Sequence, residues 1–514
     1  MNHLFSCRKK RAPIMAVALL AGVTLAGLIS GFLETPRSTN EFLHEHLAAS
    51  IIANDVTWDR EGFDLPNKDK LNIINILKQT EQAQSISDLK PILTGQALKQ
   101  VGNNKCSTHQ EICKFPMRVN RVLTSSNINK DYRVANIMET SRRVDLEIKA
   151  GGGDIRLTHL TDETRALRFY QTQSGWMHKM STDVQGYVPS FTDRAGAFRT
   201  RFAQGFTGLN YYPASAPWAD FWAKFPLEDI KVDLETAKAL NVNALRIFLN
   251  HDYFDMAETR EDALSKLNMF LDLCAARDIQ VLVTLFDLRP DYTLANWNAD
   301  IKHIDAILTA TADHKAILGI DIKNQADLDF NRWGQGRVEV WLTVMARHIQ
   351  TQYPQLAVTA GWSNAQHAVR LKDVFDIITY HEYENPKGFE VRLGKIIQAV
   401  AGKPIMITEL GTTIWKPPFI TQFGESAQAS RLNTQLTQAG QANGVFVWTL
   451  HDFDHVGKEI VGPLPWRRAQ QKYFGLVRSD GTDRPAAKIL KSFGNPSQTQ
   501  PNPTPSHSIQ NTHL

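Results

Sequence analysis

From about residue 205 onward, short apolar runs alternate with longer amphipathic stretches. Each run is flanked by polar or glycine residues, as in strands that are buried on both faces of a parallel sheet. Eight such runs occupy 206–211, 243–249, 279–286, 317–322, 356–360, 376–380, 404–408 and 444–449. The stretches between them have the length and period of helices, for example 227–240, 263–277, 306–314 and 338–351. Eight such units in about 285 residues predict an α/β protein built on one (β/α)8 TIM barrel.

An open, doubly wound sheet is the competing arrangement for alternating strands and helices. Such a sheet usually carries a glycine-rich, phosphate-binding turn after its first strand. Here the first strand is followed by Tyr211, Tyr212 and Pro213, which cannot form that turn. The barrel is therefore the favoured interpretation, and we assign it residues 205–494.

The pattern before the barrel is different. Residues 34–117 are mixed and mostly helical, whereas 118–190 favour strands. Apolar and polar residues alternate at 144–149 and 155–159, with three glycines between the two segments, which is typical of a β-hairpin. We therefore predict an accessory region at 34–204, helical and then β-rich, whose simplest role is to support the barrel.

Both ends of the chain differ from the rest. A basic cluster at 8–11 precedes an uncharged stretch at 12–33, whose 22 residues are enough to cross a bilayer as a helix. This charge pattern predicts that residues 1–33 anchor the chain in a membrane and leave the rest extracytoplasmic, in the periplasm or at the cell surface. A cleaved signal peptide is the alternative, although its apolar core is usually shorter. The tail at 495–514 is rich in Pro, Ser, Thr, Gln and Asn and is expected to be disordered.

Composition narrows the classes of partner. The formal net charge is only +4 across 514 residues, and no basic block lies outside the N-terminus, so nucleic acid is not an expected partner. No cofactor-binding motif is visible. Cys106 and Cys113 are close enough in sequence to form a disulfide in an oxidising compartment, although two free thiols explain them equally well. Cys274 lies on the apolar side of a predicted helix and is expected in the core.

Candidate functional residues follow the predicted strands at their carboxyl ends, where a barrel carries its chemistry. In strand order they are Arg246, Asn324 and Gln325, His381 and Tyr383, Glu409, and Trp448. The ends of parallel strands meet at one rim of a barrel. We therefore expect these side chains to share a single cavity.

In kind and order these residues resemble the site of the retaining β-glycosidase clan on (β/α)8 barrels, near the cellulase and β-mannanase families. The resemblance covers roughly 205–492. In those families an Asn-Glu pair ends the fourth strand and supplies the acid/base, and a Glu at the end of the seventh strand is the nucleophile. Here Glu409 occupies the nucleophile position, whereas Gln325 occupies the acid/base position. An amide cannot give up or take the proton that this position normally transfers.

The resemblance implies a role for the neighbouring residues. Arg246 would hold Glu409 ionised and oriented, since a nearby guanidinium lowers the pKa of a carboxyl. Asn324 would hydrogen-bond the sugar 2-hydroxyl, a contact that strengthens in an oxocarbenium-like transition state. His381 and Tyr383 would line the cleft, with Tyr383 near the nucleophile. Such cleavage needs no cofactor, and the implied partner is a β-linked polysaccharide or oligosaccharide.

Tryptophans are concentrated at or after the predicted strand ends. Trp448 would form an apolar platform beside the scissile bond, and Trp415 would belong to the same cleft, because flat rings stack on sugar rings. The full set is Trp218, Trp222, Trp297, Trp333, Trp362, Trp415, Trp448 and Trp466. The competing explanation, that long loops need apolar anchors, would account for some of the eight.

Gln325 leaves four hypotheses open. The chain binds glycan without cleaving it, it cleaves substrates whose leaving group needs no proton, another carboxylate replaces the missing acid, or this copy is a variant of a chain with Glu. The nearby carboxylates are Asp327, Asp329, Glu382, Glu384 and Asp452. We favour a membrane-anchored, extracytoplasmic glycoside hydrolase-like protein that acts on a β-linked polysaccharide by a retaining mechanism. The alternative is a non-catalytic glycan-binding member of a polysaccharide synthesis or export assembly.

Overall fold

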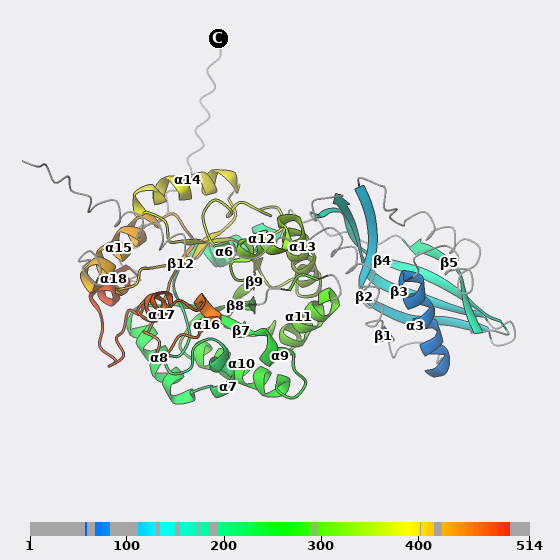
Figure 1. The fold of residues 1–514 in the computed structure, drawn as a ribbon, viewed down its shortest axis with the longest axis horizontal. Helices are drawn as coiled ribbons and strands as arrows, with labels where there is room; N and C mark the ends of the chain where they lie inside the picture. The colour runs from blue at the N-terminus through cyan, green and yellow to red at the C-terminus, as the bar shows by residue number, and fades with distance from the viewer. Residues whose placement is uncertain are drawn as a thin grey trace, which may run out of the picture.

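The described residues of the computed structural model form two β-sheets (Figure 1). One has five strands in the order β1-β2-β3-β4-β5, and the other has eight in the order β10-β9-β8-β7-β6-β13-β12-β11. The structure describes residues 57–58, 67–82, 112–129, 134–149, 155–172, 175–184, 194–288, 291–293, 296–400, 402–415 and 424–493. The predicted anchor at 1–33, Cys106 and the tail at 495–514 lie outside these ranges. Within the ranges, no helix combines the length and apolarity that crossing a bilayer requires.

The five-stranded sheet forms the accessory region. Its elements are β1 (Thr57–Trp58), α3 (Asn67–Gln82), β2 (Ile112–Asn129), β3 (Val134–Lys149), β4 (Ile155–Thr172) and β5 (Gly175–Val184). Strands β2 to β5 pair antiparallel, and the backbone of Ile148 in β3 pairs with that of Ile155 in β4 across the predicted hairpin. The alternation of apolar and polar residues in β3 places Val144 and Leu146 on a buried face of the sheet. These two side chains join the same apolar cluster as the barrel, so the sheet packs against the barrel.

The eight-stranded sheet is a barrel of parallel strands. They are β6 (Phe206–Asn210), β7 (Ala244–Asn250), β8 (Gln280–Asp287), β9 (Ile317–Lys323), β10 (Val358–Thr359), β11 (Ile378–Glu382), β12 (Ile405–Leu410) and β13 (Gly444–Val447). Neighbouring strands pair parallel throughout. A parallel bridge between Trp362 and Tyr380 joins the segments after β10 and within β11 and brings the two edges together. The predicted TIM-barrel architecture is confirmed.

Helices surround this barrel (Figure 1). They are α7 (Ala219–Lys224), α8 (Leu227–Ala239), α9 (His251–Asp255), α10 (Arg260–Ala275), α11 (Trp297–Thr311), α12 (Phe330–Trp333), α13 (Gln335–Gln352), α14 (Phe389–Ala399), α15 (Glu425–Gln438), α16 (Lys458–Val461), α17 (Pro465–Lys472) and α18 (Pro485–Phe493). One connection departs from the ideal pattern, because residues 360–377 between β10 and β11 form turns and bends instead of a helix. The accessory sheet contacts α11 and α13. Cys274 is buried, as predicted.

The amino-terminal end of the barrel is closed by α6 (Arg194–Ala203). Phe198 and Phe202 of this helix join an apolar layer formed by one residue from each strand or from the position directly before it, namely Phe206, Ala244, Leu282, Leu318, Ala357, Ile377, Met406 and Phe446. Gly208 makes room for this layer, because a Cβ atom there would lie 2.4 Å from the ring of Phe446. Because α6 and this apolar layer close the amino-terminal end of the barrel, the carboxyl end is the one available for a functional site.

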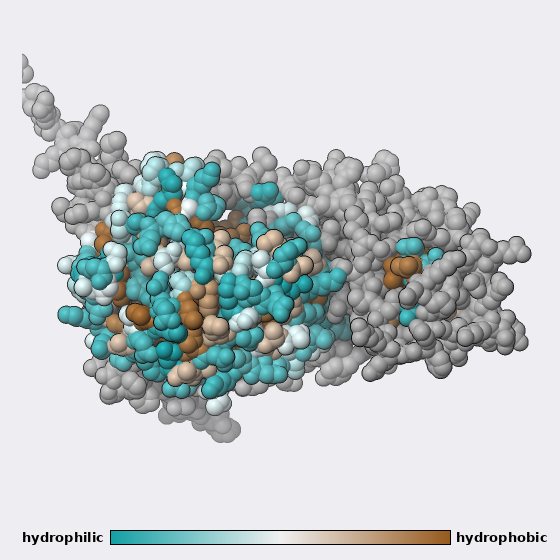
Figure 2. Space-filling view, turned by 90° about the horizontal axis from the view of Figure 1, so that it is seen from below, coloured by the Kyte–Doolittle hydropathy of each residue, from teal (hydrophilic) through white to brown (hydrophobic). Residues whose placement is uncertain are grey.

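In Figure 2 the described surface seen from below is mostly hydrophilic, with apolar residues showing between the polar ones.

Candidate active site

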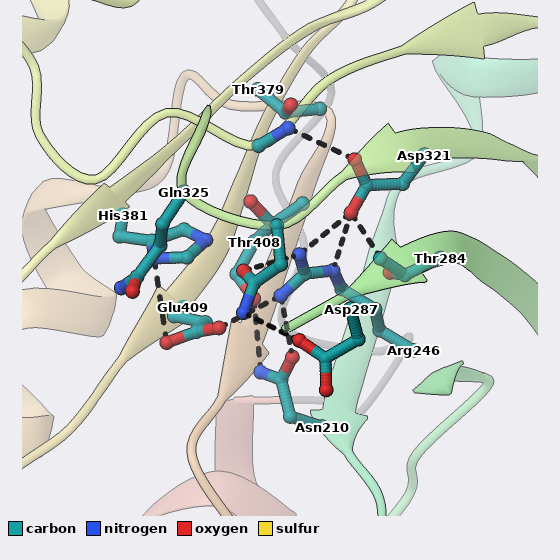
Figure 3. A network of polar contacts seen from close by, with 12 residues as sticks. Asn210, Arg246, Thr284, Asp287, Asp321, Gln325, Thr379, His381, Thr408 and Glu409 are labelled. Carbon is teal, nitrogen blue, oxygen red and sulfur yellow. Dashed lines mark hydrogen bonds and ion pairs between the residues drawn. The ribbon is translucent and has the colours of Figure 1, made fainter. Parts of the chain in front are cut away.

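Arg246 is the centre of a polar network at the carboxyl ends of the strands (Figure 3). Its side chain extends from β7 and is completely buried. Nε and Nη2 donate to Asp321 Oδ2 at 3.0 and 2.6 Å, and Nη1 donates to Glu409 Oε1 at 2.8 Å and to Asn210 Oδ1 at 3.1 Å. Nη2 also donates to Asn324 Oδ1 at 3.0 Å. All five N–H groups of the guanidinium thus have an acceptor, which a buried cation requires.

Asp321 is held as firmly as the arginine that it binds. Its Oδ2 accepts a further hydrogen bond from Thr284 Oγ1 at 2.8 Å, and its Oδ1 accepts one from the Gly361 backbone N–H at 2.9 Å. Gly361 lies so close that a Cβ atom there would be 3.1 Å from Arg246 Nη2. The backbone of 361 thus restricts the guanidinium from one side.

Glu409 lies on β12, is almost fully buried, and has both carboxylate oxygens engaged. Oε1 accepts from Arg246, and Oε2 accepts from the Tyr383 hydroxyl at 3.0 Å. Burial raises the pKa of Glu409 to about 7, and the opposing effects of Arg246 and Tyr383 offset this only in part. Arg246 lowers the pKa of Glu409, as expected, but this effect is smaller than the effect of burial. The charge of the neighbouring Asp287 carboxylate raises the pKa of Glu409 further.

Gln325 is connected to the Glu409 carboxylate by contacts through His381. Its Nε2 lies 3.1 Å from His381 Nδ1, which in turn lies 3.4 Å from Glu409 Oε2. The tips of Gln325 and Glu409 are therefore no farther apart than the sum of these two distances. Burial, followed by the charge of Arg246, lowers the pKa of His381 well below its ordinary value, so the imidazole is neutral.

The backbone of Gln325 is left-handed, with φ at +50°. A side chain other than glycine adopts this region at a cost of about 1–3 kcal/mol, and such residues cluster at functional sites. The conformation turns the chain directly after β9 and places Gln325 before the 3-10 helix η3 (Ala326–Asp329). The strain is consistent with a side chain that must point at His381.

The other carboxylates considered as replacement acids all have partners outside this network. Each is tied to its own group: Asp327 to Ser363 and His367, Asp329 to Tyr292, Glu382 and Glu384 to Arg392, and Asp452 to Arg484. None of their described contacts reaches Gln325 or Glu409. The hypothesis of a substitute among these five therefore finds no geometric support.

The sequence interpretation missed Asn210, Asp287 and Asp321. Asp287 ends β8, where its Oδ1 accepts from Asn324 Nδ2 at 3.3 Å and its Oδ2 accepts from the Tyr212 hydroxyl at 2.9 Å. Burial raises the pKa of Asp287. Asn210 and Asp287 end the first and third strands, so the strand-end rule would have found them if applied to every strand. Asp321 could also have been identified from the sequence, because a charged residue inside an apolar run needs a buried partner.

Most of the tryptophans are buried, so packing in the core explains the placement of most of the set. Those with at most 7% exposure are Trp218, Trp222, Trp297, Trp333, Trp362 and Trp448. Trp448 packs edge to face on Tyr212, at 6.4 Å between ring centroids, and on Phe248 at 6.0 Å. Trp415 is partly exposed, and its described hydrogen bond goes to Thr413, not to Glu409. Trp466 is 52% exposed.

No protein-family model matches the chain, and no curated protein matches its sequence. Among solved structures, an exo-β-1,4-mannosidase from Opitutaceae bacterium strain TAV5 is 19% identical with a TM-score of 0.46, covering 56% of this chain and 58% of its own. A GH5_18 protein from Streptomyces cattleya in complex with GlcNAc is 16% identical with a TM-score of 0.47, covering 56% of this chain and 78% of its own. The chain thus spans little more than half the length of the mannosidase. Similarity of this strength does not assign an activity.

Proposed function

We propose that the protein is a glycoside hydrolase-like enzyme that acts on a β-linked polysaccharide by a retaining mechanism, with Glu409 as nucleophile. One observation carries the proposal. Glu409 lies at the carboxyl end of the barrel with one oxygen held by Arg246 and the other by Tyr383, at 2.8 and 3.0 Å. Two donors on one carboxylate fix its direction, which a group that attacks a single carbon atom needs.

The spacing of Glu409 and Gln325 supports a direct attack. Retaining enzymes place their two carboxyl groups about 5–5.5 Å apart, whereas inverting enzymes need roughly 6.5–9.5 Å to admit a water. The distances through His381 limit the separation here to the lower edge of the second range at most. In this account Glu409 attacks the anomeric carbon and forms a glycosyl-enzyme, which water then hydrolyses.

Asn324 is suited to the sugar 2-hydroxyl. Its Oδ1 is taken by Arg246, and one N–H of its amide is directed to Asp287. The amide has a second N–H, which remains to be offered to the substrate. Because Arg246 contacts both Asn324 and Glu409, a sugar held by Asn324 is placed in register with the nucleophile.

Gln325 limits the substrates on which this site works. An amide supplies no proton, and a general acid typically contributes roughly 10²–10⁴-fold. Good leaving groups depart without that proton and are the substrates we expect. The same amide favours the alternative, a non-catalytic glycan-binding protein of a polysaccharide synthesis or export assembly. Anchoring through residues 12–33 and an extracytoplasmic location belong to both proposals, and membrane fractionation tests them.

The experiment compares aryl β-glycosides that carry activated leaving groups with unactivated polysaccharides, in the presence and absence of azide. Azide attacks a glycosyl-enzyme without needing a general base, so it should accelerate turnover and yield a glycosyl azide that keeps the β-configuration. Glu409→Gln should abolish both reactions. Binding of oligosaccharides with no turnover of any activated glycoside would favour the non-catalytic alternative.

A further inference from the structure

A second cluster of chemically competent side chains lies beside the end of β8, between α9 and α11. His251 and Asp255 are the first and last residues of α9, four positions apart and so on one face of the helix. His303 lies on the buried side of α11. One ligand atom from each of these three residues lies within 4.8 Å of the other two. The site proposed above uses none of them.

The two imidazoles are held together by packing. The ring centroids of His251 and His303 are 4.5 Å apart, and both rings contact the ring of Phe286, at 5.7 and 4.9 Å. His303 Nε2 lies 3.3 Å from the Leu285 carbonyl oxygen. Because a carbonyl only accepts, this nitrogen carries a proton, and in the neutral ring the lone pair resides on Nδ1. A backbone carbonyl that orients an imidazole in this way is a recurrent feature of histidine metal ligands.

Asp255 supplies the carboxylate and remains accessible. Its Oδ1 lies 3.5 Å from Arg260 Nη2, and the two side chains are 38% and 42% exposed. A contact this long between half-exposed groups is weak, so an ion can compete for the carboxylate. The exposure of Asp255 also gives the cluster a path to solvent.

We propose that His251, Asp255 and His303 bind a divalent transition-metal ion, and that Zn²⁺ suits them best. Two imidazoles and one carboxylate are a known three-ligand set for Zn²⁺, with water in the fourth position. Ca²⁺ and Mg²⁺ prefer sets made of oxygen and are poorly served here. Tetrahedral ligands about 2.0–2.2 Å from the metal are about 3.4 Å apart. The ligand atoms, now within 4.8 Å of one another, would have to move closer by up to about 1.4 Å, through changes of side-chain rotamer.

A metal ion bound by these three residues would affect the active site through β8. Phe286 contacts both histidines, and the next residue, Asp287, accepts the hydrogen bond of Asn324. An ion would clamp α9 to α11 around the end of β8. The expected effect is greater stability of this corner of the barrel, which does not depend on whether the barrel cleaves glycans.

The test uses the full chain without a histidine tag, stripped of metal with a chelator. ZnCl₂ is titrated by calorimetry, and Co²⁺ by its visible absorption, which is intense in four-coordinate sites. We expect one saturable equivalent and a rise in melting temperature. His251→Gln and Asp255→Asn should each weaken this equivalent at least about tenfold, since losing even an outer partner typically costs 10–100-fold.

His314→Gln is the matched control. His314 is 17% exposed and contacts one aspartate, as His251 is 13% exposed and contacts one aspartate. It should leave the affinity unchanged. His303→Gln should abolish binding, and the two more exposed variants decide the question if that buried variant fails to fold. The proposal is overturned if no saturable Zn²⁺ binding occurs, if His251→Gln binds as well as His314→Gln, or if Ca²⁺ binds as tightly as Zn²⁺.

Discussion

Arg246 donates two hydrogen bonds to one oxygen of Asp321, at 3.0 and 2.6 Å, and both side chains are completely buried. Glu409 receives only one bond from the same guanidinium. Asp321 is therefore the principal counterion of Arg246, and Glu409 is the secondary one. Burial raises the pKa of Glu409 to about 7 although this cation lies 2.8 Å away.

The first prediction follows from this competition. Asp321→Asn removes one of the two charges that share Arg246, so the pKa of Glu409 should fall below about 7. Removing a buried ion-pair partner should also destabilise the fold by up to about 3–5 kcal/mol. Carbon-13 NMR titration of the Glu409 carboxyl measures the pKa. Thr284→Val, which removes a neutral donor to Asp321, is the control and should change the pKa far less.

A second prediction concerns stability and pH. The pKa of Glu409 is raised from 4.5 to about 7, so between these values the folded state holds a proton that the unfolded state releases. Stability should thus decline as pH rises from about 4.5 to about 7, by ~3 kcal/mol for this one group. Glu409→Gln mimics the protonated form and removes this dependence. Relative to the natural chain it should gain stability at pH 8 but not at pH 4. Denaturant unfolding that gives the same difference at both pH values would refute the assignment.

Gly361 provides a steric test of the network. Gly361→Ala places a methyl group 3.1 Å from Arg246 Nη2 and 3.4 Å from His381 Nε2, so the guanidinium must give way by a few tenths of an ångström. We expect a loss of about 1–3 kcal/mol in the free energy of unfolding, as in other overpacked sites. Gly394→Ala is the control, because a Cβ atom in α14 meets no atom within 4 Å and alanine favours a helix. Thermal melts of both variants make the comparison, and equal effects would mean that Gly361 is not a tight contact.

The fold was predictable because its signals are local, whereas parts of the site were not. Eight apolar runs fix the number of strands, and a strand end fixes where Gln325 and Glu409 must lie. The sharing of Arg246 between Asp321 and Glu409 depends on side-chain directions that no spacing in the sequence contains. The burial of Trp362 and Trp448 likewise depends on which rings the fold brings to them. The pKa of Glu409 is a sum of such contacts and cannot be read from its neighbours in sequence.

The fourth prediction concerns a substitution that restores the missing acid. Gln325→Glu is nearly isosteric, so hydrolysis of unactivated β-glycans should appear or rise by up to roughly 10²–10⁴-fold. Gln325→Ala, which offers no proton and no hydrogen bond to His381, is the control and should give no such gain. Sugar release from a panel of polysaccharides is the measurement. A Gln325→Glu chain that binds glycan but cleaves none of them would favour the binding protein.

Covalent trapping tests most directly whether Glu409 is the nucleophile. A 2-deoxy-2-fluoro β-glycoside with a dinitrophenyl leaving group needs no acid for departure, and its fluorine slows hydrolysis of the glycosyl-enzyme. After incubation with a panel of such sugars, the chain is digested and its peptides are measured by mass spectrometry. We predict one added fluorosugar on the peptide that contains Glu409, and none in the Glu409→Gln variant. A label on another residue, or no label from any sugar in either the natural chain or Gln325→Glu, would contradict the account.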